Sequence, residues 1–278
     1  MSASHAMDLD AYFQRVGYGG PAVPTMDTLR RLQVLHPAAI PFEAIDVLLD
    51  RGVDLAPDAV ERKLVGARRG GYCFEHNGLF QRVLTAIGFE VEGLLARVRW
   101  QAAADAPPTP ATHMTLRVIL DGEAWLVDVG FGSALPTAPL RLNTLEPQTT
   151  DHEDYRLRPA GDNLILEARL GDDWMPLYEV LLEPRVEADY QVANWFTSTH
   201  QTSHFRHNLT VARTTPEARY ALLDDRLTVR YPSGATQRRF LDVEGVREAL
   251  AETFALPVAP DWQAAIERAV LNGSAARE

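Results

Sequence analysis

The chain has 278 residues, of which 46% are hydrophobic and 23% are charged, a composition typical of a folded protein with two or three domains. Its 27 basic and 38 acidic residues give a net charge of −11, so its surface as a whole should repel nucleic acid and anionic membranes. No apolar run approaches 18 residues, which predicts the absence of a transmembrane helix.

The N-terminal stretch MSASHAMDLDAYFQ (1–14) lacks the basic region and the apolar region of a secretory signal. The chain has a single cysteine, Cys73, so it cannot form an internal disulfide. Both features predict a protein of the reducing cytoplasm.

The first 88 residues show the spacing of helices. Apolar residues of LDAYFQRV (9–16) fall on one helical face, and Thr25 suits the N-cap of a second helix. A third helical pattern covers 79–87 and stops at Gly88, a natural C-terminal residue of a helix. Cys73 therefore lies at or near the start of this third helix, where the positive end of the helix dipole favours a thiolate.

From residue 89 the apolar period changes to two, which indicates strands. Two of them, HMTLRVIL (113–120) and AWLVDVGF (124–131), are joined by the hairpin signal Asp-Gly-Glu at 121–123. The segment Ala102–Ala111 is rich in proline and alanine and is expected to be a surface loop. Further strands are expected at NLILEARL (163–170) and WMPLYEVL (174–181).

The last part of the chain has a mixed pattern. RLTVRYPSG and ATQRRFLDV predict a hairpin that turns at 232–234, and residues 243–254 predict an amphipathic helix. The order is thus helical, strand-rich and mixed, with expected domains at 1–88, 89–193 and 194–278. Val246, Ala249 and Leu250 should face inward from the last of these helices.

The stretch RRGGYCFEHN (68–77) places the lone thiol of Cys73 behind two glycines. A free cysteine is most often a buried apolar residue, but it acts as a nucleophile where a base pairs with it and an acceptor orients that base. His76 follows on the same helix and is poorly placed as this base. His113 begins a strand, and Asp128 interrupts an apolar strand where a buried carboxylate needs a strong donor such as an imidazole N–H.

Spacing alone leaves two interpretations open. Cys73, His113 and Asp128 either form a catalytic triad or have separate structural roles. The hairpin makes the two strands antiparallel, but His113 lies eight residues before its tip and Asp128 five residues after Glu123. A neighbouring strand or a bulge would have to bring the two side chains together.

RRGGYCFEHN resembles the active-site signature of the arylamine N-acetyltransferases. Three residues depart from the family pattern, namely Ala44 for asparagine, His76 for glutamine and Gln201 for proline. Other stretches resemble the family in the same order: YFQRVGY (12–18), IPFEAID (40–46), THMTLRV (112–118), VDVGFG (127–132) and NWFTSTHQTSHFRHNLTVAR (194–213).

The resemblance implies an α+β fold in three parts, with an N-terminal helical bundle, a central β-barrel and a C-terminal α/β lid around a transglutaminase-like core. It implies an acyltransferase of xenobiotic metabolism that uses acetyl-CoA as cosubstrate and no metal, and acts on a small aromatic amine or hydrazine. The Cys73 thiolate would carry the acetyl group in a ping-pong reaction. His113 would be its base and ion-pair partner, and Asp128 would orient His113.

The resemblance also suggests an apolar slot for the aromatic ring. The candidates for the slot are Phe131, Gly132, Val98, Phe42 and Phe205.

Arg69 and Glu75 flank the thiol, and we expect them to brace the loop around it rather than to take part in the chemistry.

Other functions are compatible with the same residues. One is an amide synthase of the same family that acts on a carrier-bound acyl substrate, and others are a non-catalytic binding relative or a cysteine hydrolase. A homodimer is a further expectation for the assembly. His200, His204 and His207 could share a metal, but the chain offers no further ligand pattern beside them. Arg238 and Arg239 are expected to be a solvated pair or to meet the phosphates of CoA.

Overall fold

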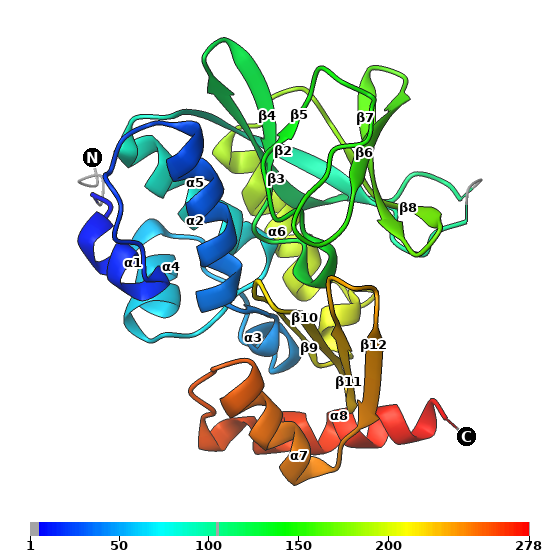
Figure 1. The fold of residues 1–278 in the computed structure, drawn as a ribbon. Helices are drawn as coiled ribbons and strands as arrows, with labels where there is room; N and C mark the ends of the chain where they lie inside the picture. Colours follow the sequence, from blue (N-terminus) through cyan, green and yellow to red (C-terminus); the bar gives the residue numbers. More distant parts are fainter. Residues whose placement is uncertain (1–5, 104–105, 278) are drawn as a thin grey trace.

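The computed structural model describes residues 6–103 and 106–277. Two sequence predictions fall partly outside this range. They are the absence of a secretory signal in residues 1–14, of which 1–5 are not described, and the surface loop, of which 104 and 105 are not described. The rest of that loop has no helix or strand until Ala111. Figure 1 shows three regions: helices of the N-terminal part, a curled sheet beside them, and a second sheet with helices beneath it.

The N-terminal helices begin and end where their caps predict. The Asp8 and Thr25 side chains accept backbone N–H groups at the starts of α1 and α2, and Gly88 ends α5 in the left-handed conformation with φ 106°. The helices of this part are α1 (Leu9–Val16), α2 (Met26–Ala39), α3 (Ile45–Leu48), α4 (Pro57–Glu61) and α5 (Cys73–Ile87), with a π-helical turn at Arg62–Gly66.

A seven-stranded antiparallel sheet follows, with the strand order β5-β4-β3-β2-β8-β7-β6. It curls into the barrel-like shape seen in Figure 1. The predicted hairpin at 121–123 joins β3 to β4. The strands are β2 (Glu90–Val98), β3 (Ala111–Leu120), β4 (Glu123–Val127), β5 (Leu140–Arg141), β6 (Tyr155–Ala160), β7 (Asn163–Leu170) and β8 (Asp173–Val180).

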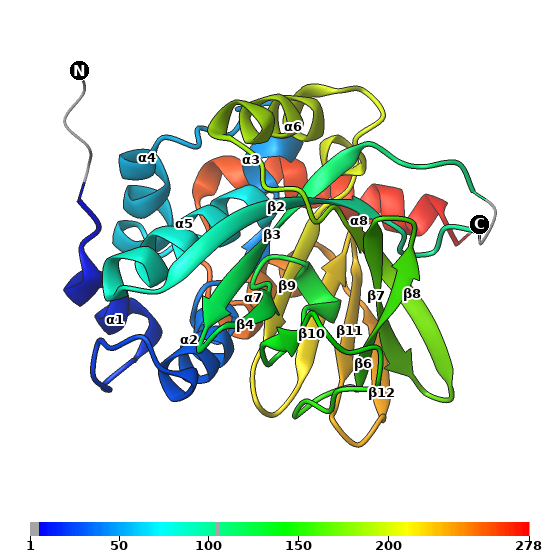
Figure 2. The ribbon, with the colours of Figure 1, turned by 90° about the horizontal axis from the view of Figure 1, so that it is seen from above.

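The C-terminal part is a five-stranded sheet packed on helices. Figure 2 looks down through the barrel-like sheet onto these strands. The predicted hairpin is β11–β12, and the predicted helix is α7 followed by a π-helical turn at Ala249–Thr253. The elements are α6 (Glu187–Thr199), β9 (Thr210–Thr214), β10 (Arg219–Leu223), β11 (Arg226–Arg230), β12 (Thr236–Phe240), α7 (Val243–Glu248) and α8 (Gln263–Ala275).

The N-terminal and C-terminal parts of the chain both contribute strands to this second sheet. Its edge strand β1 (Phe42–Glu43) comes from the N-terminal part and pairs with β9. A buried apolar cluster likewise joins the N-terminal helices to the barrel-like sheet through residues such as Phe80 and Leu116. The predicted domain ranges 1–88, 89–193 and 194–278 therefore share a sheet and an apolar core. Their exact bounds stay a prediction.

No helix of residues 6–103 and 106–277 combines the length and the apolar character that a membrane span requires.

Candidate active site

Cys73 is the first residue of α5 and is buried. The third residue of the helix, Glu75, accepts the backbone N–H of Tyr72 at 3.0 Å and thereby fixes the start of the helix. The thiol lies 3.7 Å from the carbonyl oxygen of Thr112 in β3. The start of α5 thus presents the thiol to the first residues of β3, a strand inside the barrel-like sheet.

Partly buried ion pairs hold the loop that leads to Cys73. Lys63 contacts Glu75 and Asp46 at 2.8 Å each. Arg69 contacts Glu43 at 2.7 Å and Asp46 at 3.1 Å. Arg69 and Glu75 thus contact the loop as the sequence suggested, while Lys63, Glu43 and Asp46 complete the set.

Two glycines allow close approaches around the thiol. A Cβ at Gly70 would lie 2.0 Å from the carbonyl oxygen of Pro41, and a Cβ at Gly130 would lie 2.9 Å from the Cα of Cys73. Both distances are too short for any side chain. Gly130 therefore allows the loop after Asp128 to pack directly on the start of α5.

His113 and Asp128 meet inside the protein. The His113 Nε2 lies 2.6 Å from the Asp128 Oδ2, and both side chains are buried. The β3–β4 register pairs Leu116 with Val127 and so brings Thr115 opposite Asp128, with His113 two residues further on the same face. β3 also bulges at Thr112, because Ala111 and His113 pair with consecutive residues of β2. The sequence had left this contact open, and the bulge lies directly beside it.

The strand carrying Asp128 is shorter than predicted, since β4 ends at Val127 rather than running through Phe131. The Asp128 Oδ1 accepts the backbone N–H of Gly130 at 2.8 Å, which bends the chain out of the sheet. The same oxygen accepts the Asn77 amide at 3.0 Å, and Asn77 also bonds the backbone of Met114 and Val129. Asn77, one turn after Cys73, thus ties α5 to the carboxylate.

The charges of this pair stabilise each other. Burial opposes a charge on His113, but the Asp128 carboxylate, with Cys73, outweighs it and raises the pKa of His113 to about 10. Burial also opposes the charge of Asp128, but His113, Asn77 and the Gly130 N–H hold its pKa below the usual range. His113 is therefore protonated at neutral pH. Its Nε2 bonds to Asp128, which leaves Nδ1 for the thiol.

The predicted slot residues fall into two groups. The Phe131 ring lies 5.0 Å from the His113 ring, and Tyr178 packs 4.8 Å from both. Val98 pairs with Tyr178 across β2 and β8. On the other side, the Phe42 and Phe205 rings are 5.9 Å apart. Gly132, with φ 70°, joins the groups, since a Cβ there would lie 3.9 Å from Phe42.

His76 makes its hydrogen bonds away from the thiol, while its ring stacks on the Phe42 ring at 6.3 Å. Its Nδ1 lies 2.9 Å from the His36 Nε2, and its Nε2 lies 3.1 Å from the carbonyl oxygen of Pro41. The His36 Nδ1 lies 2.9 Å from the Tyr12 hydroxyl. Burial lowers the pKa of His76 to about 4 and holds the pKa of His36 well below its usual value. Both rings are therefore neutral, with Tyr12 donating to His36, His36 to His76, and His76 to Pro41.

Acid should destabilise the fold through these histidines. The unfolded chain binds protons on histidine below about pH 6.5, whereas His76 stays neutral in the folded state down to about pH 4. Stability is therefore lost as the pH falls, and the contribution of His76 is about 2 kcal/mol between neutral pH and about pH 5. His76→Gln keeps a donor for Pro41 and an acceptor for His36 without a titrating group.

The urea midpoints of both proteins measured against pH test this prediction. His76→Gln should match the wild type near neutral pH and exceed its unfolding free energy by about 2 kcal/mol near pH 5. If the unfolding free energies of the two proteins change with pH by the same amount, the prediction is wrong.

The three histidines His200, His204 and His207, predicted as possible metal ligands, have other partners. His200 bonds Thr202, His207 bonds the carbonyl of Gln201, and the His204 ring packs 3.8 Å from the Phe205 ring. Within the described part of the chain, no three histidine, cysteine, aspartate or glutamate residues gather as a metal site would require.

Known proteins match this chain over nearly all of its length. The N-acetyltransferase family profile matches residues 25–263. The arylamine N-acetyltransferase of Mycobacterium tuberculosis is 46% identical over 257 residues, which cover 91% of each chain. The chain belongs to the arylamine N-acetyltransferase family. It is therefore an acyltransferase, as its motifs indicated.

Solved structures of the arylamine N-acetyltransferase family agree with the fold. The M. tuberculosis enzyme matches with a TM-score of 0.90 at 44% identity, covering 95% of this chain and 99% of that one. The Mycobacterium marinum enzyme, solved in complex with CoA, matches with a TM-score of 0.90 at 42% identity, covering 95% and 98%. These matches confirm the predicted three-part α+β fold.

Several residues that contact the site were not predicted from the sequence, among them Asn77, Lys63 and Tyr178. Asn77 stood in the quoted motif, and its spacing of four from Cys73 places both on one helical face, which was a usable signal. No pattern in the sequence indicated Lys63 or Tyr178. Tyr178 reaches His113 only because β8 lies next to β2 in the sheet, an order that the chain sequence does not reveal.

Proposed function

We propose that the protein transfers the acetyl group of acetyl-CoA to aromatic amines and hydrazines through an acetyl-cysteine on Cys73. The observation that carries the proposal is the buried His113–Asp128 pair, 2.6 Å apart, whose free imidazole nitrogen is left for the thiol at the start of α5. Membership of the family and the CoA complex of the M. marinum relative support acetyl-CoA as the donor.

In the first half-reaction the Cys73 thiolate attacks the thioester carbonyl carbon. A carbon–sulfur bond forms to Cys73, the bond to CoA breaks, and the CoA sulfur leaves with the proton that His113 carries. His113 is charged at neutral pH because Asp128 raises its pKa, so it pairs with the thiolate before the donor arrives. A thiolate attacks a thioester easily, since the leaving group is chemically equivalent to the nucleophile.

In the second half-reaction the aromatic amine attacks the acetyl-cysteine. Its nitrogen bonds to the carbonyl carbon, His113 takes the proton that the nitrogen loses, and Cys73 leaves as a thiolate. Aromatic amines suit this step because they are largely unprotonated at neutral pH. We propose that their ring lies against Phe131, with the remainder of the slot formed by Gly132, Val98, Phe42 and Phe205.

Asp128 holds His113 in the tautomer that this chemistry needs. Its carboxylate accepts the Nε2–H, so Nδ1 faces the sulfur. Asn77 and the Gly130 N–H hold the carboxylate itself. We propose a cytoplasmic location, since a lone thiol nucleophile stays reduced there.

Initial-rate kinetics with acetyl-CoA and aniline test the proposal. Parallel double-reciprocal lines are expected, because CoA leaves before the amine binds. Benzylamine is a matched acceptor that is protonated at neutral pH and should react far more slowly. Intersecting lines would contradict the acetyl-cysteine route, and no turnover with acetyl-CoA would favour an amide synthase or a binding relative.

A further inference from the structure

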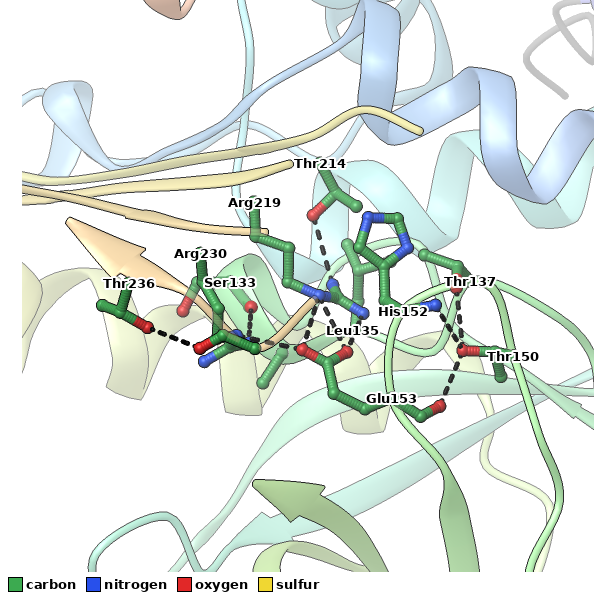
Figure 3. A network of polar contacts seen from close by, with 12 residues as sticks. Ser133, Leu135, Thr137, Thr150, His152, Glu153, Thr214, Arg219, Arg230 and Thr236 are labelled. Carbon is green, nitrogen blue, oxygen red and sulfur yellow. Dashed lines mark hydrogen bonds and ion pairs between the residues drawn. The ribbon is translucent and has the colours of Figure 1, made fainter. Parts of the chain in front are cut away.

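Three charged residues form a cluster between the two sheets, which we call the seam cluster: Glu153, Arg219 and Arg230. Figure 3 shows both arginines, from strands of the second sheet, directed at Glu153, which precedes β6. The Arg219 Nη2 lies 2.6 Å and the Arg230 Nε 3.0 Å from the carboxylate. Their side chains are 11%, 1% and 25% exposed in the order given.

The seam cluster also holds the loop that follows Phe131. Arg230 donates from Nη2 to the carbonyl oxygen of Ser133 at 3.0 Å. Tyr155 donates from its hydroxyl to the carbonyl oxygen of Leu135 at 2.9 Å, and Arg219 donates to that hydroxyl at 3.0 Å. Arg230 thus holds the Ser133 carbonyl (Figure 3), and Tyr155, which Arg219 contacts, holds the Leu135 carbonyl.

This loop connects the seam cluster to the reacting groups. It starts at Phe131, whose ring lies edge-on to His113 at 5.0 Å. Gly132 follows in the left-handed conformation, where the backbone approaches Phe42. A shift at Ser133 would therefore move the residues that we propose to hold the acceptor ring, while Cys73 lies on α5 outside this loop.

The charge balance argues for a positioning role. Two guanidinium groups share one carboxylate, so one positive charge lacks an ionic partner within the cluster and is balanced by carbonyl oxygens such as that of Ser133. Buried charge pairs give little net stability, but the planar guanidinium fixes several acceptors at defined angles. Arg230 contacts the Glu153 carboxylate through Nε at 3.0 Å as an ion pair, and it donates a hydrogen bond to the loop through Nη2.

We infer that Arg230 is a positioning residue for the acceptor half of the reaction, holding the loop of Phe131 through the carbonyl of Ser133. The inference rests on the proposed function. Removing this charged hydrogen bond should raise the KM for the aromatic amine about tenfold. Acetylation of Cys73 by acetyl-CoA should stay within about twofold, because the thiol, His113 and Asp128 do not contact Arg230.

The test measures the two half-reactions separately in Arg230→Gln. Intact mass against time gives the acetylation rate with acetyl-CoA alone, and single turnover of the acetylated enzyme against aniline concentration gives the acceptor step. Arg226→Gln, an exposed residue of the same strand β11, is the matched control and should change neither. Arg230→Lys provides a milder variant where Arg230→Gln does not fold.

A tenfold weaker acceptor step with unchanged acetylation supports the inference. An acceptor step equal to that of the wild type, or equal losses in both half-reactions, overturns it. A wild-type protein that forms no acetyl-enzyme overturns the proposed function, and the inference with it. The wild-type control therefore separates the two failures.

Discussion

Asp128→Asn is expected to lower kcat/KM for acetyl transfer about 10⁴-fold while the protein stays folded. The substitution keeps the shape of the side chain, and its Oδ1 can still accept the Gly130 N–H and the Asn77 amide. Its NH2 group, however, replaces the oxygen that accepts the His113 Nε2–H. His113 must then carry its proton on Nδ1, where it faces the thiol and cannot act as a base.

The same substitution removes the charge that raises the pKa of His113. The imidazole of the variant should therefore be neutral near pH 7.5, and the thiolate should lose its cationic partner. Alkylation of Cys73 by iodoacetamide, measured between about pH 6 and 9, reports this directly. Wild type should react faster than Asp128→Asn at the same pH, because only the wild-type thiol keeps a charged imidazole beside it.

Asp121→Asn is the matched control for this prediction. Asp121 lies in the exposed turn between β3 and β4, has φ 53°, and should tolerate asparagine without change in rate. Equal alkylation profiles for wild type and Asp128→Asn would show that the carboxylate does not set the state of His113.

Cys73→Ser should abolish acetyl transfer, with a loss on the order of 10⁵–10⁶-fold. Serine keeps the size of the side chain and can still contact the Thr112 carbonyl, so the fold should be retained. Its hydroxyl does not ionise in the presence of His113 at neutral pH, and the attack on the thioester is lost. Cys73→Ala should give the same loss.

Steady-state turnover of the two variants, with thermal unfolding as the check on folding, tests this prediction. A variant that folds and retains turnover within about tenfold of wild type would contradict a nucleophilic Cys73.

Much of the framework around the site could be predicted from local pattern. The apolar spacing before Gly88 placed Cys73 at a helix start, because helix ends follow from caps and periodicity. The Asp-Gly-Glu turn predicted the β3–β4 hairpin for a similar reason. These features depend on residues close in sequence.

The rest depended on contacts between distant segments. The bulge at Thr112 forms where β3 pairs with β2, so the strand of His113 does not reveal it by its own pattern. Asp128 was expected within a strand, but β4 ends at Val127, one residue before it. The hydrogen bond from the Gly130 N–H to Asp128 turns the chain at this point. Glu153 and Arg219 meet across 66 positions, and no local signal predicts such a pair.

The most direct test of the account is the mass of the intact wild-type protein after mixing with acetyl-CoA and no acceptor. We predict a gain of one acetyl group, located on the peptide that contains Cys73, and its loss on addition of aniline. Cys73→Ser should gain none. A wild-type protein that stays unmodified, or that carries the acetyl group on another residue, would contradict the account.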